Sequence, residues 1–257
     1  MLNELRRVLA TFQYFTRIPM PRWVGHDGAQ LGGTTRYLPF VGIVVGAVGA
    51  GCIWAGAKMF PSVLAVLLST ALTAVITGAF HEDGLADTAD GLGGGHTRER
   101  ALEIMKDSRI GAFGALALLF VLGAKIVALA ALPVAQALIV LICGHALSRW
   151  CAVALMWRLP YARADSSTRA QPVVAGMSFL DLAIATVFGF APLALAVVAV
   201  GISLAVTGAL AAVVTCIALG LWYRRRLGGY TGDTLGATQQ LSELTFYLAW
   251  LAAWNLS

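Results

Sequence analysis

The run Leu182–Tyr223, LAIATVFGFAPLALAVVAVGISLAVTGALAAVVTCIALGLWY, decides the fold because its 42 residues are continuously apolar. A helix rises about 1.5 Å per residue, so one helix of this length would be roughly twice as long as a hydrocarbon core of about 30 Å is thick. The run must therefore turn, and Gly201 is the expected position. It predicts two consecutive membrane-spanning helices, at about 180–199 and 202–223.

Apolar runs of similar length recur through the rest of the chain. The mean hydropathy is +0.79, and charged residues make up only 12% of the sequence. Each run has about the 20 residues that a helix needs to cross a bilayer. We therefore predict an all-α, polytopic membrane bundle of about seven spans, folded as one transmembrane domain over residues 1–257. The five further spans are expected at about 37–57, 60–80, 110–132, 134–157 and 235–256.

The first 20 residues predict a helix lying in the membrane interface. Its apolar residues share one face, whereas Glu4, Arg7 and Thr11 face away. No apolar segment with a small-residue cleavage site follows, so we expect no signal peptide. A polar, glycine-rich loop is expected at 21–36. The cysteines lie in apolar runs without CxxC spacing, so no disulfide framework is expected: Cys52, Cys143, Cys151 and Cys216.

The basic residues fall almost entirely on one side of the predicted spans. Lys58 lies alone on the opposite side, and Lys125 and Arg149 lie within spans, where Lys125 is expected to reach the outer interface. By the positive-inside rule, the side of the N-terminus is the cytoplasm. Because these charges set the topology, the net charge of +5 does not indicate nucleic-acid binding. The fifteen residues on that side, of 18 in all, are Arg6, Arg7, Arg17, Arg22, Arg36, Arg98, Arg100, Lys106, Arg109, Arg158, Arg163, Arg169, Arg224, Arg225 and Arg226.

Acidic residues concentrate between Gly78 and Gly111, which hold seven of the 13 in the chain. Asp83, Asp87 and Asp90 have the spacing i, i+4, i+7, so they share one face of a helix that continues from the second span. Three carboxylates this close repel one another unless a cation lies between them. Mg²⁺ takes oxygen ligands of this kind. The motif predicts a Mg²⁺ site, with a solvated acidic helix end as the alternative.

A second predicted helix, from Thr97 to Ser108, carries further charged residues. Glu103 and Asp107 repeat the i, i+4 spacing and are predicted to complete a two-helix site, Glu103 as a catalytic residue and Asp107 as a metal ligand. Lys106 and Arg109 lie beside them and are predicted to neutralise a diphosphate.

Three more charged residues lie in or beside the later spans. Arg149 lies in the fourth span and needs a partner, either a substrate phosphate, a motif carboxylate or a structural ion pair. Asp233 begins the last helix, either as a further metal ligand or as an N-cap. Glu243, deeper in that helix, is predicted to make a polar contact or accept a proton.

The chain lacks the usual arrangements for nucleophilic catalysis, including GxSxG. A carboxylate–Mg²⁺ site at the cytoplasmic face of a helical bundle suits the transfer of a phosphate-linked group.

The segment His81–Gly91, HEDGLADTADG, resembles the HxDGLADxxDG signature of the cobalamin synthase (adenosylcobinamide-GDP ribazoletransferase) family. The resemblance extends over nearly the whole chain. Its other matches are Phe15–Pro19 (FTRIP), Leu102–Gly111 (LEIMKDSRIG), Ser148–Trp150 (SRW) and Gly232–Asp233 with Gly236.

The resemblance implies a Mg²⁺-dependent enzyme of the bacterial inner membrane, with its active site facing the cytoplasm. A hydroxyl of α-ribazole, or of its 5′-phosphate, would attack the corrinoid-proximal phosphorus of adenosylcobinamide-GDP and release GMP. Within the matched motifs we predict substrate contacts for His81, Gly91 and Arg17. The division of Asp83, Asp87 and Asp90 between metal binding and catalysis stays open. A homo-oligomer or association with other enzymes of nucleotide-loop assembly is also expected.

Two alternatives remain at this point. The CDP-alcohol phosphotransferases share the DxxDG that runs from Asp87 to Gly91, but the rest of their signature is poorly matched. A cation transporter would use the acidic face as an entry site, but it needs polar groups on the outer side, which the sequence lacks.

Overall fold

A computed structural model describes residues 2–25, 33–163 and 177–257. Arg169 and residues 26–32 of the loop predicted at 21–36 lie outside the described residues. Within these ranges the chain folds into helices, and the single β-bridge joins Tyr161 to Tyr230. The all-α prediction is confirmed.

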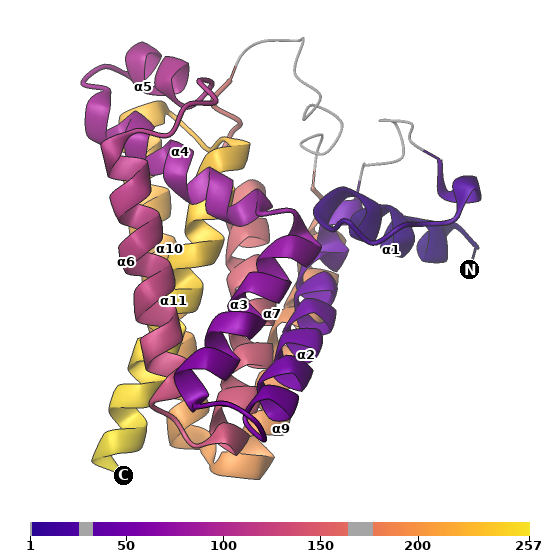
Figure 1. The fold of residues 1–257 in the computed structure, drawn as a ribbon. Helices are drawn as coiled ribbons and strands as arrows, with labels where there is room; N and C mark the ends of the chain where they lie inside the picture. Colours follow the sequence, from indigo (N-terminus) through magenta and orange to yellow (C-terminus); the bar gives the residue numbers. More distant parts are fainter. Residues whose placement is uncertain (1, 26–32, 164–176) are drawn as a thin grey trace.

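Most helices follow one another with short connections, and longer segments separate α1 from α2 and α7 from α9 (Figure 1). Their bounds are α1 Leu2–Phe15, α2 Leu38–Gly56, α3 Ser62–Thr77, α4 Phe80–Gly94, α5 Arg98–Ile104, α6 Ala112–Ala130, α7 Val134–Arg158, α9 Phe179–Val200, α10 Ile202–Leu227 and α11 Gly232–Leu256, with short 3₁₀ helices η1 Arg22–Val24 and η3 Thr34–Tyr37.

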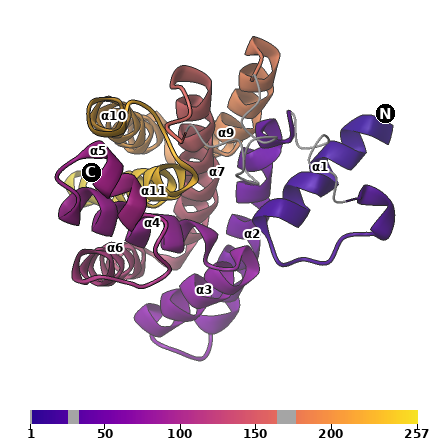
Figure 2. The ribbon, with the colours of Figure 1, turned by 90° about the horizontal axis from the view of Figure 1, so that it is seen from above.

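Five of the described helices are long and apolar enough to cross a membrane: α2, α6, α7, α9 and α10. The count rises to six if α3 and α4 are taken together as one bent span. The last predicted span, α11, is 25 residues long, and it packs against α4, α6, α7 and α10 near the centre of the bundle (Figure 2). Its polar first half is buried there, as a helix inside a membrane bundle requires. The chain is a multi-pass membrane protein.

The turn expected at Gly201 is present. Gly201 ends α9 and precedes α10 with φ +93°, a conformation that a residue with a side chain rarely adopts. The opening run therefore forms two helices, and the prediction is confirmed.

The sequence suggested that the acidic motif continues the helix of the second span. This expectation is wrong, because the chain forms two separate helices, α3 and α4, joined by a sharp bend. Gly78 (φ +64°) and Ala79 (φ +56°) both have left-handed backbone conformations, and α4 leaves the elbow at 90° to α3. The guanidinium of Arg17 lies over Gly78, in the space that a Cβ atom would occupy. As a result α3 runs along the bundle, while α4 crosses its end (Figure 1).

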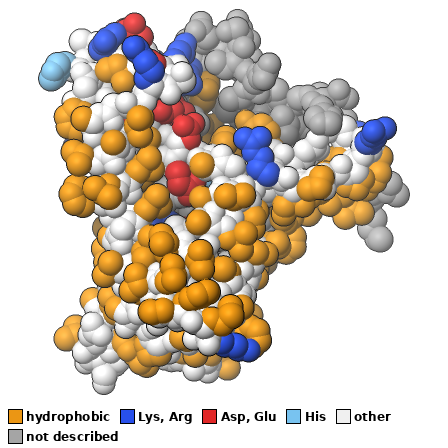
Figure 3. All heavy atoms as spheres, in the orientation of Figure 1, with side chains coloured by type: hydrophobic (Ala, Val, Ile, Leu, Met, Phe, Trp, Pro, Cys, Tyr) orange, Lys and Arg blue, Asp and Glu red, His pale blue; other side chains and the backbone are white. Residues whose placement is uncertain are grey.

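Charged side chains gather at the end of the bundle that carries α4 and α5, and apolar side chains cover the body below it (Figure 3). We call this the charged end. At the opposite end, the ammonium of Lys58 lies 3.5 Å from the centre of the Trp54 ring. The helix α1 lies crosswise beside the charged end (Figure 1), which suits the predicted interfacial helix. Two ion pairs connect α1 to the bundle. Glu4 of α1 pairs with Arg36, and Arg36 in turn pairs with Asp181 of α9. All four cysteines are free, as expected.

Candidate functional site

The site is built where α4 crosses α11. A Cβ atom on Gly84 would lie 2.8 Å from the carbonyl oxygen of Asp233 and 3.1 Å from the Cα atom of Gly236. Two glycines therefore allow the two backbones to touch. This contact brings α4, which carries the His81–Gly91 motif, to the first turn of α11, although the two segments are about 150 residues apart in the sequence.

Three carboxylates lie around this crossing: Asp83, Asp87 and Asp233, which we call the acidic cluster. Asp233 accepts a hydrogen bond from Nη2 of Arg163 at 2.7 Å. The side chains of Asp83 and Asp87 form no hydrogen bond or ion pair with other described residues. The pKa of Asp87 is raised to about 7 by partial burial and by the negative charges of Asp83, Asp233 and Asp90, with Arg163 acting in the opposite direction. The cluster thus carries negative charge that its protein surroundings leave largely uncompensated.

The donor chemistry of the acidic cluster fits a hard divalent cation, which prefers carboxylate oxygens. A positive ion at this position would relieve the repulsion that raises the pKa of Asp87. Among the described residues, no three His, Cys, Asp or Glu side chains are arranged as a metal-binding group. The fit therefore rests on charge and donor type, not on an assembled coordination shell.

Asp90, predicted from its spacing to share this site, is placed differently. It is buried, and its two oxygens accept hydrogen bonds from the backbone N–H groups of Gly111 at 2.7 Å and Gly114 at 2.9 Å. These N–H groups belong to the first turn of α6, where the helix itself offers them no acceptor. Asp90 therefore fastens α6 to α4, and the metal and catalytic roles assigned to it stay predictions.

The second predicted helix is shorter than expected. It begins after the N-cap Thr97 and ends at Ile104, not at Ser108. The Asp107 side chain accepts from the backbone N–H of Arg109 and pairs with its guanidinium at 2.6 Å, and such local bonds compete with helix continuation. The prediction that Glu103 and Asp107 share one face of a helix is therefore wrong, because Asp107 lies beyond the end of α5. The Arg109 guanidinium also holds the pKa of Asp107 down at about 2.

A pocket of about 290 Å³ opens beside the acidic cluster, between α5 and the segment after α7. Arg163 lines this pocket and also binds Asp233, so it joins the two features. Of the two cations predicted to meet a diphosphate, Lys106 lines the pocket, whereas Arg109 does not. Glu103 lies at the pocket and pairs with Arg100 at 2.7 Å. The lining residues are Arg98, Glu99, Leu102, Glu103, Lys106, Ala162 and Arg163.

The remaining predicted substrate contacts lie away from this pocket. His81 is buried in the bundle, and Arg17 lies at the elbow between α3 and α4. Gly91 is buried under α5, where an added Cβ atom would collide with Met105 and lie 2.9 Å from the carbonyl oxygen of Ala101. Packing accounts for Gly91, and the substrate contacts of all three residues stay predictions.

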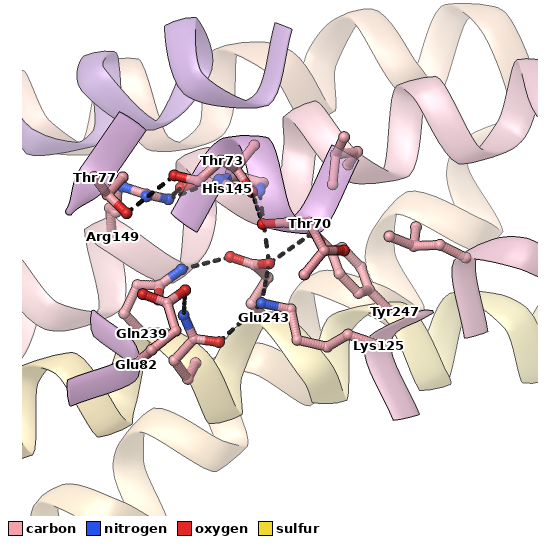
Figure 4. Close-up of a pocket in the computed structure, with 13 residues that line it drawn as sticks. Thr70, Thr73, Thr77, Glu82, Lys125, His145, Arg149, Gln239, Glu243 and Tyr247 are labelled. Atoms are coloured by element: carbon pink, nitrogen blue, oxygen red, sulfur yellow. Dashed lines mark hydrogen bonds and ion pairs between the residues drawn. The ribbon is translucent and has the colours of Figure 1, made fainter. Parts of the chain in front are cut away.

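Arg149 lies in a narrow cavity inside the bundle, which Glu82 of α4 also lines (Figure 4). Its Nη1 atom is 3.0 Å from both Nδ1 and the carbonyl oxygen of His145. Glu82 of the signature lines the same cavity, and its Oε1 atom accepts a hydrogen bond from Gln240 at 2.9 Å. The cavity has a volume of about 20 Å³, enough for a water molecule or two, so a phosphate does not fit there.

The centre of this cavity is Glu243, whose carboxylate is surrounded by partners (Figure 4). Lys125 pairs with it at 2.6 Å, and Tyr247 donates a hydrogen bond at 2.9 Å. Gln239 donates another, at 2.5 Å. The polar contact predicted for Glu243 is confirmed, but the expectation for Lys125 is wrong. Lys125 is 6% exposed and points into the bundle because a carboxylate and Gln240 are available there.

Arg163 is a neighbour of the site that the sequence pattern does not indicate. Arg163 was counted only as a topology charge, and nothing in its local sequence connects it to Asp233. The N-cap alternative for Asp233 is also excluded, because Thr231 is the N-cap of α11 and forms a capping box with Thr234. A Thr two residues before Asp233 was the signal that could have decided this.

Comparison with known proteins finds relatives that match over nearly the whole chain. The family model described as cobalamin-5-phosphate synthase, CobS, matches residues 7–251. An adenosylcobinamide-GDP ribazoletransferase of Leptothrix cholodnii is 48% identical, covering 98% of this chain and 97% of its own. Proteins of the same name from Ralstonia nicotianae and Shewanella amazonensis are 44% and 40% identical, covering 95% and 99% of this chain. No solved structure matches. The chain belongs to the CobS family of cobalamin-5-phosphate synthases.

Proposed function

We propose that this enzyme is an adenosylcobinamide-GDP ribazoletransferase of cobalamin biosynthesis. Relatives with this name cover nearly its full length. In the proposed reaction, a hydroxyl of α-ribazole or its 5′-phosphate attacks the corrinoid-proximal phosphorus of adenosylcobinamide-GDP. The bond from that phosphorus to the bridging oxygen breaks, and GMP leaves. Nothing in the comparisons favours a lipid phosphotransferase or a cation transporter.

The observation that carries this proposal is the acidic cluster joined through Arg163 to a pocket with basic side chains. Asp83, Asp87 and Asp233 would hold Mg²⁺, which when bound neutralises charge on a diphosphate and its leaving group. Arg98, Lys106 and Arg163 would bind phosphate oxygens. Glu103 borders the pocket and is the carboxylate that we assign to accept the proton of the attacking hydroxyl.

We place the enzyme in the bacterial inner membrane with the charged end in the cytoplasm. Support comes from the basic residues at the ends of α7 and α10, Arg158 and Arg224 to Arg226, which favour the cytoplasmic side. Both proposed substrates would then meet the site from the cytoplasm. A homo-oligomer, or association with other enzymes of nucleotide-loop assembly, remains a prediction of the sequence.

The test is incubation of the purified protein with adenosylcobinamide-GDP, α-ribazole and Mg²⁺, with GMP measured by chromatography. We expect GMP and a cobalamin product in equal amounts, and neither product when EDTA replaces Mg²⁺. Full turnover in EDTA would remove the metal from the proposal. Absence of GMP with a folded protein, or activity with a CDP-activated lipid instead, would overturn the reaction itself.

A further inference from the structure

A second hollow, away from the acidic cluster, lies between α9 and α10. These two helices lie on either side of α7 when the bundle is viewed from the charged end (Figure 2). The groove between them has a volume of about 420 Å³. Its floor is α7, and its lining is almost wholly apolar apart from Arg158 and Arg224.

The length of the groove along α10 matches the thickness of one membrane leaflet. On α10 its lining runs from Val213 to Arg224, which at about 1.5 Å per residue is roughly 16 Å. Half of a hydrocarbon core of about 30 Å is about 15 Å. Trp157 also lines the groove, near the charged end of the bundle, and is 45% exposed. Tryptophan is enriched at the membrane–water interface, which is where this end of the groove would lie.

The two arginines lie together at the mouth of the groove. Arg158 is the last residue of α7, and Arg224 lies in the last turn of α10. Both are exposed, and neither forms an ion pair with a described residue. No described acidic residue lines the groove. The hollow therefore offers an apolar wall along the leaflet and, at the level of the headgroups, two arginines that no described carboxylate neutralises.

We propose that this groove binds an anionic phospholipid from the leaflet at the charged end. One acyl chain would lie along the wall formed by α7 and α10, and the phosphate would bind Arg158 and Arg224. Basic pockets between membrane helices on the cytoplasmic side suit such headgroups. A second copy of the chain is a poorer occupant, because a symmetric contact through this face would bring the arginines of both copies together.

The experiment measures lipid retention by the full chain. The protein is equilibrated in mild detergent with equal amounts of phosphatidylglycerol and phosphatidylcholine that carry the same acyl chains, and bound lipids are counted by native mass spectrometry. A surface arginine favours an anionic lipid roughly fivefold, so two should give a preference of about 25-fold for phosphatidylglycerol. Equal retention of the two lipids by the wild-type chain would overturn the proposal. Detection of the protein as a dimer without bound lipid would also overturn it.

Matched variants then locate the bound lipid. The double variant Arg158→Gln/Arg224→Gln should lose the roughly 25-fold preference. The control Arg225→Gln removes a neighbouring exposed charge that does not line the groove, and it should keep the preference. An equal loss in the control would assign the preference to general surface charge and overturn the site. Ala154→Phe, which narrows the groove without changing its charge, should lower retention of phosphatidylglycerol, and unchanged retention would count against the groove.

Discussion

The network around Glu243 and the acidic cluster both join α11 to its neighbours, but they treat negative charge in opposite ways. Glu243 is 1% exposed and has Lys125, Tyr247 and Gln239 as partners. Asp83 and Asp87 have no such partners among the described residues. A carboxylate with complete partners belongs to the frame of the bundle. In the proposed function, the carboxylates left without them are balanced by a cation and a phosphate-bearing substrate.

This difference also separates stability from activity. A buried ion pair is costly to break, because the remaining charge stays in a medium that solvates it poorly. An acidic cluster without a cation already suffers repulsion, so removing one of its charges does not destabilise the fold in the same way. Substitutions in the network around Glu243 should therefore mainly lower stability. Substitutions in the acidic cluster should mainly lower turnover.

The largest effect on stability is expected from Lys125→Met. The change leaves Glu243 buried without its cation, which should cost about 3–5 kcal/mol of unfolding free energy. Unfolding in detergent, followed by circular dichroism, measures it. The matched double variant Lys125→Met/Glu243→Gln removes both charges and should recover most of the loss. If the single variant is as stable as the wild type, the ion pair does not hold the bundle.

The largest effect on activity is expected from Asp87→Asn in the acidic cluster. It should lower Mg²⁺-dependent GMP release at least about 100-fold, comparable with the loss of one group that stabilises charge in a transition state. Its unfolding temperature should not fall, because the change removes repulsion between carboxylates. Full Mg²⁺-dependent turnover by the folded variant would exclude Asp87 from the site.

The approach of α4 to α11 can be tested with two glycines of the same helix. Gly84→Ala places a Cβ atom 2.8 Å from the carbonyl oxygen of Asp233, so we expect a cost of about 1–3 kcal/mol together with reduced turnover. Gly94→Ala is the control, since its nearest neighbour would be Ile104 Cδ1 at 3.5 Å. Equal behaviour of the two variants would show that the close crossing does not matter.

The charge of the acidic cluster should also make stability depend on pH. Because the pKa of Asp87 is raised from 3.8 to about 7, the folded state binds its proton more tightly than the unfolded state does. In Mg²⁺-free buffer this contribution is complete below about pH 4 and is lost as the pH rises through 7. Unfolding measured between pH 5 and 8 should show a decline that Mg²⁺ reduces and that Asp87→Asn lacks.

Much of this arrangement could be predicted from the sequence, because periodicity and span length act locally. The turn at Gly201 follows from the length of one apolar run. The i, i+4 spacing places Asp83 and Asp87 together, whereas spacing alone does not show that Asp90 binds the start of α6. The right-angled elbow at Gly78 and Ala79 could not be predicted in this way, since apolar residues lead up to it without a break. Lys125 was misplaced for a related reason. Its partner Glu243 is 118 positions away, and only the fold shows that a buried lysine has a carboxylate beside it.

Asp107 is where spacing and structure disagree most directly, and it should give the smallest effect. Spacing makes it a metal ligand, whereas the structure places it beyond the end of α5, paired with Arg109. Exposed pairs of this kind contribute little to stability. We therefore expect Asp107→Asn to retain GMP release within about twofold of the wild type, with an unchanged Mg²⁺ requirement, as is usual for surface substitutions. A loss as large as that of Asp87→Asn would mean that the loop after α5 rearranges to bring Asp107 to the metal, and the helical spacing in the sequence would then describe the active state better than the loop seen here.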